Sequence, residues 1–367
     1  MLKSLREDYV ITEDWTGEKY LGLTLKWDYV NRNVSVSIPG YVQAALLKFQ
    51  IEASTKPQDD LHRWNQTIYG AKNQYADTNN ADWMAAESTV YVQRVYGLLL
   101  YYVIAVHQKM FVFLNTIATS QAHVNTTTMG DIVRLLNYVA THPDATLQYH
   151  ARDMILQISS DASYLCEERA RSQDRDHFSL ANWIVDNDDK PPNLFTNNGA
   201  IHTLCQIIKS VMSSVAEAKI GVTFLNTKDA LLIRTTLKEI GHPQPPTTMQ
   251  VDNTTAVSFS NNTIKQKQSK AICMRFYCIR DSTFQYHFNI YCSPGSNNLG
   301  DYHTKHHFPG HKQLMRSHFL YDDPNLHLAN LVVMHLLWGC VNLRKMCAVH
   351  AEPGINDRRH ITAVKPL

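Results

Sequence analysis

The sequence has no excess of charge of either sign, no paired-cysteine motif and no long apolar run. Lys plus Arg (35) nearly balance Asp plus Glu (33), so no bulk basic charge marks a nucleic-acid binder, and any basic surface must be local. The seven cysteines are odd in number and form no CxxC pair. The cysteines therefore indicate neither a zinc ribbon nor a disulfide framework, and a reducing intracellular location, cytoplasmic or nuclear, is predicted.

A membrane segment is not expected either. The most apolar runs, Val95–Val106 and Leu328–Val341, are shorter than the ~20 residues that a spanning helix needs. The N-terminal residues MLKSLREDYV contain no apolar signal core. The sequence therefore predicts globular structure with no membrane partner.

Strand-like and helix-like patterns alternate along the chain, and this alternation predicts a mixed α/β fold. Lys19–Val36 has two alternating runs around an Asn-Arg-Asn turn, typical of a β-hairpin, and Tyr41–Phe49 has helical spacing. Residues 55–87 are polar and lack periodicity, as in a linker. Further helices are predicted from Ser88, over Met110–Ala122 and over Met129–Ala140.

The second half begins with two predicted strands, Ala145–His150 and Asp153–Ser159, which we expect to pair as a hairpin. Between His202 and Lys238 the spacing indicates two helices with a break near Gly221. Alternation over residues 285–293 predicts a late strand, and Leu326–Leu337 has the apolar spacing of a helix in the C-terminal tail.

Two carboxylates follow predicted strands. Met154, Leu156 and Ile158 share one face of an alternating run, which places Asp161 of ISSDASYL at a strand end, and Asp252 follows a short strand in the same way. A carboxylate held there is well placed to bind a metal or act as a catalytic acid. The same position also suits a plain turn-forming Asp.

A series of segments in fixed order resembles the C-terminal part of the polyprotein of copia-type long-terminal-repeat retrotransposons, from the end of reverse transcriptase through ribonuclease H. The matching segments are YLGLTLKWDY, IPGYVQAALLKF, GLLLYYVIAV, ISSDASYL, SSVAEAKIG, LKEIGHPQP with VDNTTAV, KQSKAICMRFYCIRD and GSNNLGDYHTKHH. The resemblance spans about residues 3–320. It implies a palm-end hairpin and thumb-like helix (1–54), a polar linker (55–87), a helical connection (88–144), a ribonuclease H-like domain (145–320) and a tail (321–367).

The resemblance also implies a reaction and a site. A ribonuclease H-like domain has a central mixed sheet flanked by helices, and its four carboxylates hold two Mg²⁺ or Mn²⁺ ions that clamp the scissile phosphate of the RNA strand in an RNA–DNA hybrid. Carried over by motif, the ligands and catalytic residues are Asp161, Glu217, Asp252 and Asp301.

Several positions depart from the family pattern. The helix motif Glu-Ala-Glu reads Glu-Ala-Lys here, with Lys219 in the second position. Residues two apart on a helix are roughly 200° apart around its axis, so only one of the pair faces the metals. We assign Glu217 and expect Lys219 to point away. With the opposite register, a lysine ~4 Å from the site at an effective dielectric of ~20 opposes each unit of metal charge by about 4 kcal/mol.

Other substitutions are Cys273, Cys278 and the charged run SQDRDHF after the first carboxylate. They leave open an alternative function, a catalytically dead nucleic-acid-binding or structural remnant of the same fold. The paired palm aspartates that polymerases need are absent before Tyr20, so we expect no DNA synthesis.

Three further features each have two interpretations that the sequence does not separate. The histidines between His303 and His318 match no closed zinc pattern and suit a phosphate-facing or solvated surface. The basic stretch Lys265–Arg275 suits a hybrid backbone or a solvated helix face. Trp15, Trp27 and Tyr29 suit either core packing or base stacking.

Overall fold

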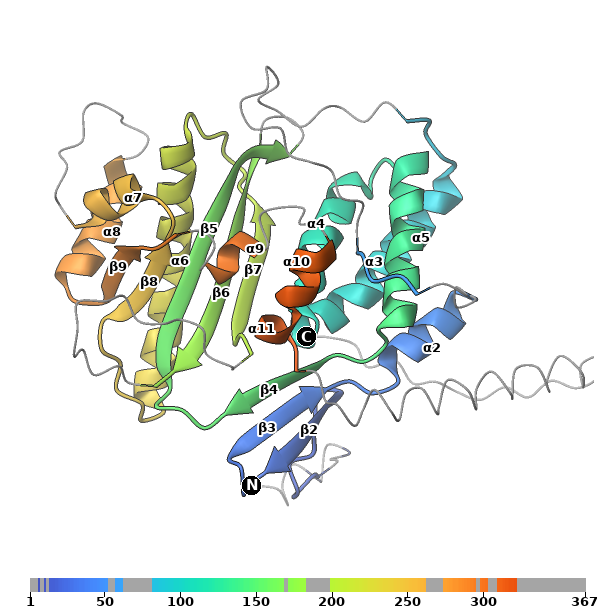
Figure 1. Cartoon of the computed structure of the whole chain (residues 1–367), viewed down its shortest axis with the longest axis horizontal. Helices are drawn as coiled ribbons and strands as arrows, with labels where there is room; N and C mark the ends of the chain where they lie inside the picture. The colour runs from blue at the N-terminus through green and yellow to red at the C-terminus, as the bar shows by residue number, and fades with distance from the viewer. Residues whose placement is uncertain are drawn as a thin grey trace, which may run out of the picture. The chain divides into compact units, whose positions relative to one another are not determined.

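A computed structural model of the chain shows a mixed α/β architecture with two sheets and flanking helices (Figure 1). The described residues up to Tyr321 belong to one compact unit. The structure describes residues 13–51, 57–61, 81–167, 171–182, 199–261, 273–294, 298–302 and 309–321, with isolated residues 6 and 10. Most of the predicted linker and the predicted helix Leu326–Leu337 lie outside these residues.

The first sheet is antiparallel and confirms the predicted N-terminal hairpin, because β2 pairs with β3 and the connection between them is only residues 29–32. The other predicted hairpin is wrong, since β4 pairs with β3 and not with the strand that follows it. The connection Ala151–Met154 leaves the sheet, with Met154 in the left-handed region at φ 61°. In sheet order the strands are β1 (Lys19–Tyr20), β2 (Leu23–Asp28), β3 (Asn33–Ser37) and β4 (Thr146–His150).

Helices pack beside this sheet around one apolar core. The helix predicted from Ser88 is confirmed, and its residues Val92, Val95 and Leu99 are all buried. His107 is buried between the rings of Tyr102 and Tyr138, and this burial lowers its pKa well below the ordinary value. The helices are α2 (Tyr41–Lys48), α3 (Ala86–Ala105), η1 (Gln108–Met110), α4 (Phe111–Ser120) and α5 (Thr126–Thr141).

Gly97 in the middle of α3 offers a test of this half of the fold. A Cβ built at Gly97 meets no atom within 4 Å, so alanine fits without displacing a neighbour. Because glycine costs a helix interior about 0.5–1 kcal/mol relative to alanine, Gly97→Ala raises the free energy of unfolding by that amount. Urea unfolding measures it, with Gly130→Ala in α5 as a second open helical site. A loss of stability in Gly97→Ala would contradict the placement of α3.

The second sheet is mixed and carries the carboxylates of interest. Its central strand β5 pairs antiparallel with β6 and parallel with β8, and β8 pairs parallel with β9. Strand β5 continues past Asp161 to Glu167, so Asp161 lies within the strand and not at its end. In sheet order the strands are β7 (His202–Ile207), β6 (Arg171–Ala181), β5 (Ile155–Glu167), β8 (Thr247–Val251) and β9 (Phe288–Cys292).

One long helix, α6 (Val215–Glu239), packs on this sheet, and its residues Ile220 and Ala230 share a buried apolar cluster with Ile158 of β5. The predicted break near Gly221 is wrong, because the helix runs through it, and a Cβ there would lie 3.1 Å from the Met212 methyl group. The residues from His202 form strand β7, not a helix. The remaining helices are α7 (Thr254–Ser260), α8 (Cys273–Phe284), α9 (Leu299–Tyr302), α10 (Pro309–Leu314) and α11 (Arg316–Phe319).

The aromatic residues of the hairpin are on the surface. Trp27 and Tyr29 are stacked, with ring centroids 6.1 Å apart, and they are 45% and 78% exposed. Trp15 is 82% exposed. Core packing is therefore the wrong interpretation for these rings. No helix among the described residues is long and apolar enough to cross a membrane.

Candidate functional site

Asp161 and Asp252 come together at neighbouring parallel strands. Gln250 on β8 is level with Ser159 on β5, so the residues two positions further along both strands lie side by side. Asp252 directly follows β8 and is partly exposed, whereas Asp161 is buried within β5. The structure thus brings two of the four predicted ligands to one place.

The group between these carboxylates is the ammonium of Lys219 on α6. Its Nζ donates a short hydrogen bond to Oδ1 of Asp161 and lies 2.7 Å from Oδ1 of Asp252. The lysine side chain is only 10% exposed. One buried cation therefore bridges both carboxylates.

The electrostatics keep this cation charged. Burial lowers the pKa of Lys219, but the attraction of Asp161 and of Asp252, with the hydrogen bonds to them, outweighs burial and holds the pKa above its ordinary value. The three groups carry one net negative charge. Lys219 therefore acts as a fixed internal counter-ion at neutral pH.

The predicted orientation of Glu217 and Lys219 is wrong. Oε2 of Glu217 accepts hydrogen bonds from the backbone N–H of Ser213, at 2.7 Å, and from its hydroxyl. The Ser214 hydroxyl in turn accepts a hydrogen bond from the Glu217 N–H, at 3.1 Å, as the N-cap of α6. Glu217 thus serves the helix terminus, and the residue two positions later, roughly 200° around the axis, faces the sheet.

A sequence signal for this orientation was present. Ser214 followed three residues later by Glu217 is a capping box, the pairing in which the glutamate turns back to the first turn of its helix. Recognising it places Glu217 at the third helical position and Lys219 on the opposite side. The resemblance to the family motif favoured the other register.

Asp301 lies in α9, and its side chain is outside the described residues. The backbone of that helix packs on the strands beside Asp161, because a Cβ on Gly300 would lie 3.1 Å from the Asp161 N and from the Arg175 carbonyl oxygen. Asn298 also donates a 2.9 Å hydrogen bond to the Ser160 carbonyl. A glycine at position 300 is what allows this close approach.

The residues present do not fit a pair of divalent cations. Carboxylate oxygens are suitable ligands, but Oδ1 of both Asp161 and Asp252 contacts the Lys219 ammonium. A divalent ion ~4 Å from that ammonium meets about 4 kcal/mol of repulsion for each unit of its charge at an effective dielectric of ~20. Within the described part of the chain, no group of three or more His, Cys, Asp or Glu residues could hold a metal ion.

Sequence reasoning missed a second buried acidic pair on β6. The neighbouring strand places Asp174 and Asp176 two residues apart on one face of the sheet. Asn226 of α6 donates hydrogen bonds to Asp176 and, at 2.8 Å, to the Ser160 hydroxyl, while Gln206 donates to Asp174 at 3.0 Å. The partners of this pair are neutral, in contrast to those of Asp161.

Burial dominates the acid–base behaviour of this pair. It raises the pKa of Asp174, and it raises the pKa of Asp176 well above the ordinary value, with the nearby Asp174 charge adding to the shift. Two close carboxyls without a cation share a proton more readily than they carry two charges. The pattern that could have revealed this is the charged run SQDRDHF, whose residues Ser172–Phe178 are buried in the strand.

Neither the protein-family models nor the curated proteins match this chain. The copia-type resemblance therefore rests on the sequence segments alone, and function has to be argued from the site.

Proposed function

We propose that this chain is a retrotransposon-derived, ribonuclease H-like protein that binds RNA–DNA hybrid without cutting it. The observation that carries this proposal is the Lys219 ammonium between Asp161 and Asp252. A buried lysine there supplies the positive charge that divalent ions supply in the active relatives implied by the resemblance. Of the two functions considered from the sequence, we therefore favour the non-catalytic one over two-metal hydrolysis of RNA.

The fold supports the ribonuclease H-like part of the proposal. The resemblance implies a small mixed sheet with helices, and the second sheet has five strands, three antiparallel and two added in parallel, with α6 across it. Asp161 on β5 and Asp252 after the parallel strand β8 lie on neighbouring strands, which supports a site shared by the two carboxylates. Without bound metals, this scaffold lacks the two-metal route to an activated water.

Incubation of the purified chain with an end-labelled RNA–DNA hybrid tests both halves of the proposal. We expect a mobility shift with the hybrid and no RNA cleavage in Mg²⁺ or Mn²⁺, at the same background as Asp161→Asn. The physical reason is that the cation-binding oxygens are already paired with Lys219.

Two outcomes would overturn the proposal. RNA cleavage by the wild-type chain that disappears in Asp161→Asn would show a working nuclease. The absence of any shift with hybrid, in a preparation that melts cooperatively, would leave only a structural role. A primer-extension reaction on the same preparation is expected to incorporate no nucleotide.

A further inference from the structure

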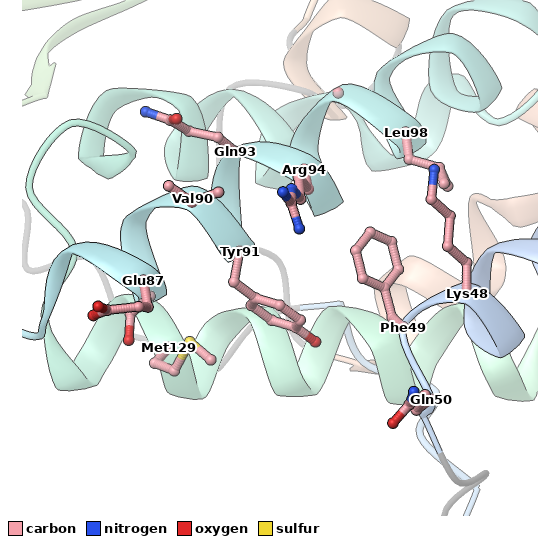
Figure 2. A pocket seen from close by; sticks show the side chains of 12 residues that line it. Lys48, Phe49, Gln50, Glu87, Val90, Tyr91, Gln93, Arg94, Leu98 and Met129 are labelled. Carbon is pink, nitrogen blue, oxygen red and sulfur yellow. The ribbon is translucent and has the colours of Figure 1, made fainter.

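An open groove lies between the C-terminal end of α2, the outer face of α3 and the start of α5, away from the second sheet. Its volume is about 1220 Å³, which is larger than a typical small-molecule pocket of ~300–1,000 Å³. The side chains that define its chemistry are those of Lys48, Phe49, Glu87, Tyr91, Arg94 and Met129 (Figure 2).

The α3 wall is a single helix face. Glu87, Tyr91, Arg94 and Leu98 are spaced by four, three and four residues, so their side chains project in the same direction. Gly97 also lines the groove and adds no side chain, which leaves the wall open beside Arg94. The groove is therefore built on a rigid 20-residue helix rather than on a loop.

Two aromatic rings form the floor. Phe49 and Tyr91 meet edge to face, with centroids 5.6 Å apart and planes at 79°, an arrangement that leaves a ring face unoccupied by its partner. Burial raises the pKa of the Tyr91 phenol, so this ring is neutral at physiological pH. Figure 2 shows the Arg94 side chain projecting from α3 toward the space between these rings.

Two cationic side chains, Lys48 and Arg94, line the groove. Neither Lys48 nor Arg94 forms an ion pair or hydrogen bond with another described residue, and both are exposed. Glu87, the acidic residue of the lining, lies a full α3 turn beyond Tyr91, toward the start of the helix. The end of the groove near Lys48 and Arg94 is thus positive and borders an aromatic floor.

We propose that this groove binds a nucleotide unit, with the base against Phe49 and Tyr91 and the phosphate between Arg94 and Lys48. An aromatic plane joined to an anion matches both features at once. Arginine is suited to such a site because its guanidinium stacks on rings and pairs with phosphate oxygens. The groove shares no residue with the Lys219 site, so this inference does not rest on the proposed function.

Calorimetric titration of the full chain with adenosine monophosphate, ribose 5-phosphate and a single-stranded deoxyadenosine 12-mer tests the proposal. We expect saturable binding of the monophosphate, and binding of ribose 5-phosphate weaker by about ten-fold because stacking is lost. Arg94→Glu and Lys48→Glu should each weaken binding by at least about ten-fold. Lys26→Glu, an equal charge change at an exposed position on β2, is the matched control and should bind as the wild type does.

Comparing the two ligands shows whether the groove binds a free nucleotide or a nucleotide within a single strand. A 12-mer that binds at least ten-fold more tightly than the monophosphate identifies a single strand, and equal affinity identifies the free nucleotide. Absence of saturable binding to both ligands would overturn the proposal. So would equal losses in Arg94→Glu and Lys26→Glu, or equal affinity for a poly-glutamate peptide, which carries charge without a base. Melting curves of the variants confirm that they fold.

Discussion

Lys219→Glu is expected to convert a metal-independent fold into one that requires a divalent cation. Without metal, the variant places three carboxylates where the wild type has two and a bridging ammonium. Breaking a buried ion pair in this way costs about 3–5 kcal/mol of unfolding free energy. Added Mn²⁺ or Mg²⁺ should then restore stability, by about 2.7 kcal/mol at a hundred-fold excess over Kd.

Thermal melts in chelator and in 10 mM Mn²⁺ or Mg²⁺ measure this response, which needs no catalytic activity. The wild-type Tm should be the same in both conditions. Lys228→Glu, an exposed position of the same helix that lies over the Phe224 ring, gives the same change of charge without adding a ligand. Lys219→Met removes the cation and supplies no oxygen, so it should lose stability and gain nothing from metal. A wild-type Tm that rises with Mn²⁺ as much as that of Lys219→Glu would refute the role given to this lysine.

Asp176→Asn is expected to stabilise the protein at neutral pH and to leave it unchanged near pH 4. The pKa of Asp176 is raised in the folded state, so its contribution to stability is fully present below the ordinary carboxyl pKa. That contribution is lost as the pH rises from about 4 through the raised pKa, because the carboxyl ionises freely in the unfolded chain but leaves an unfavourable buried charge when it ionises in the folded chain. Asparagine mimics the protonated form and avoids this loss.

The expected gain is about 1–3 kcal/mol at pH 7 to 8, the usual cost of burying a polar group without full compensation. Urea unfolding of variant and wild type between pH 4 and pH 8 measures it, and the quantity of interest is the difference between the two. The difference is needed because His177 adds a pH dependence of its own. Burial lowers the pKa of His177 to about 4, so this histidine destabilises the folded state of both proteins as the pH falls below 6.5. Subtracting the two curves removes that contribution.

Asp281→Asn, at an exposed carboxylate of α8, is the matched control and should show no pH-dependent difference. A gain for Asp176→Asn that is equal at pH 4 and pH 8 would contradict a shared proton on β6. It would assign the effect to packing alone.

The elements were predictable where periodicity was unambiguous. The N-terminal hairpin, the helix α3 and the strands before Asp252 and around Ile290 follow from spacing alone. The elements that were predicted wrongly have a local sequence pattern that favours one structure, but their tertiary contacts favour another. Strand β4 pairs with the edge of β3 and not with β5, which is nearer in sequence, and α6 runs unbroken through Gly221, beside the Met212 methyl group.

The two carboxylates of the candidate site were predictable from the sequence, but the identity of the α6 side chain that faces them was not. Motif order located Asp161 and Asp252, and the structure brings them together. The choice between Glu217 and Lys219 depended on a capping interaction at Ser214, a local contact that family resemblance does not reveal. The Asp174–Asp176 pair was missed because a run of charged residues is normally solvated, and here it is enclosed by α6 on a sheet interior.

The late pairing of β4 with β3 has a consequence for synthesis. Ser37 of β3 pairs with Thr146 of β4. More than a hundred residues must therefore be synthesised after β3 before the strand that covers its free edge is available. At ~5–20 residues per second, the ribosome needs about 5–20 s to deliver that strand. During this interval an unpaired edge with exposed Trp27 beside it is open to other nascent chains. The yield of folded protein should therefore depend on translation speed between residues 38 and 146 more than on the stability of the finished fold.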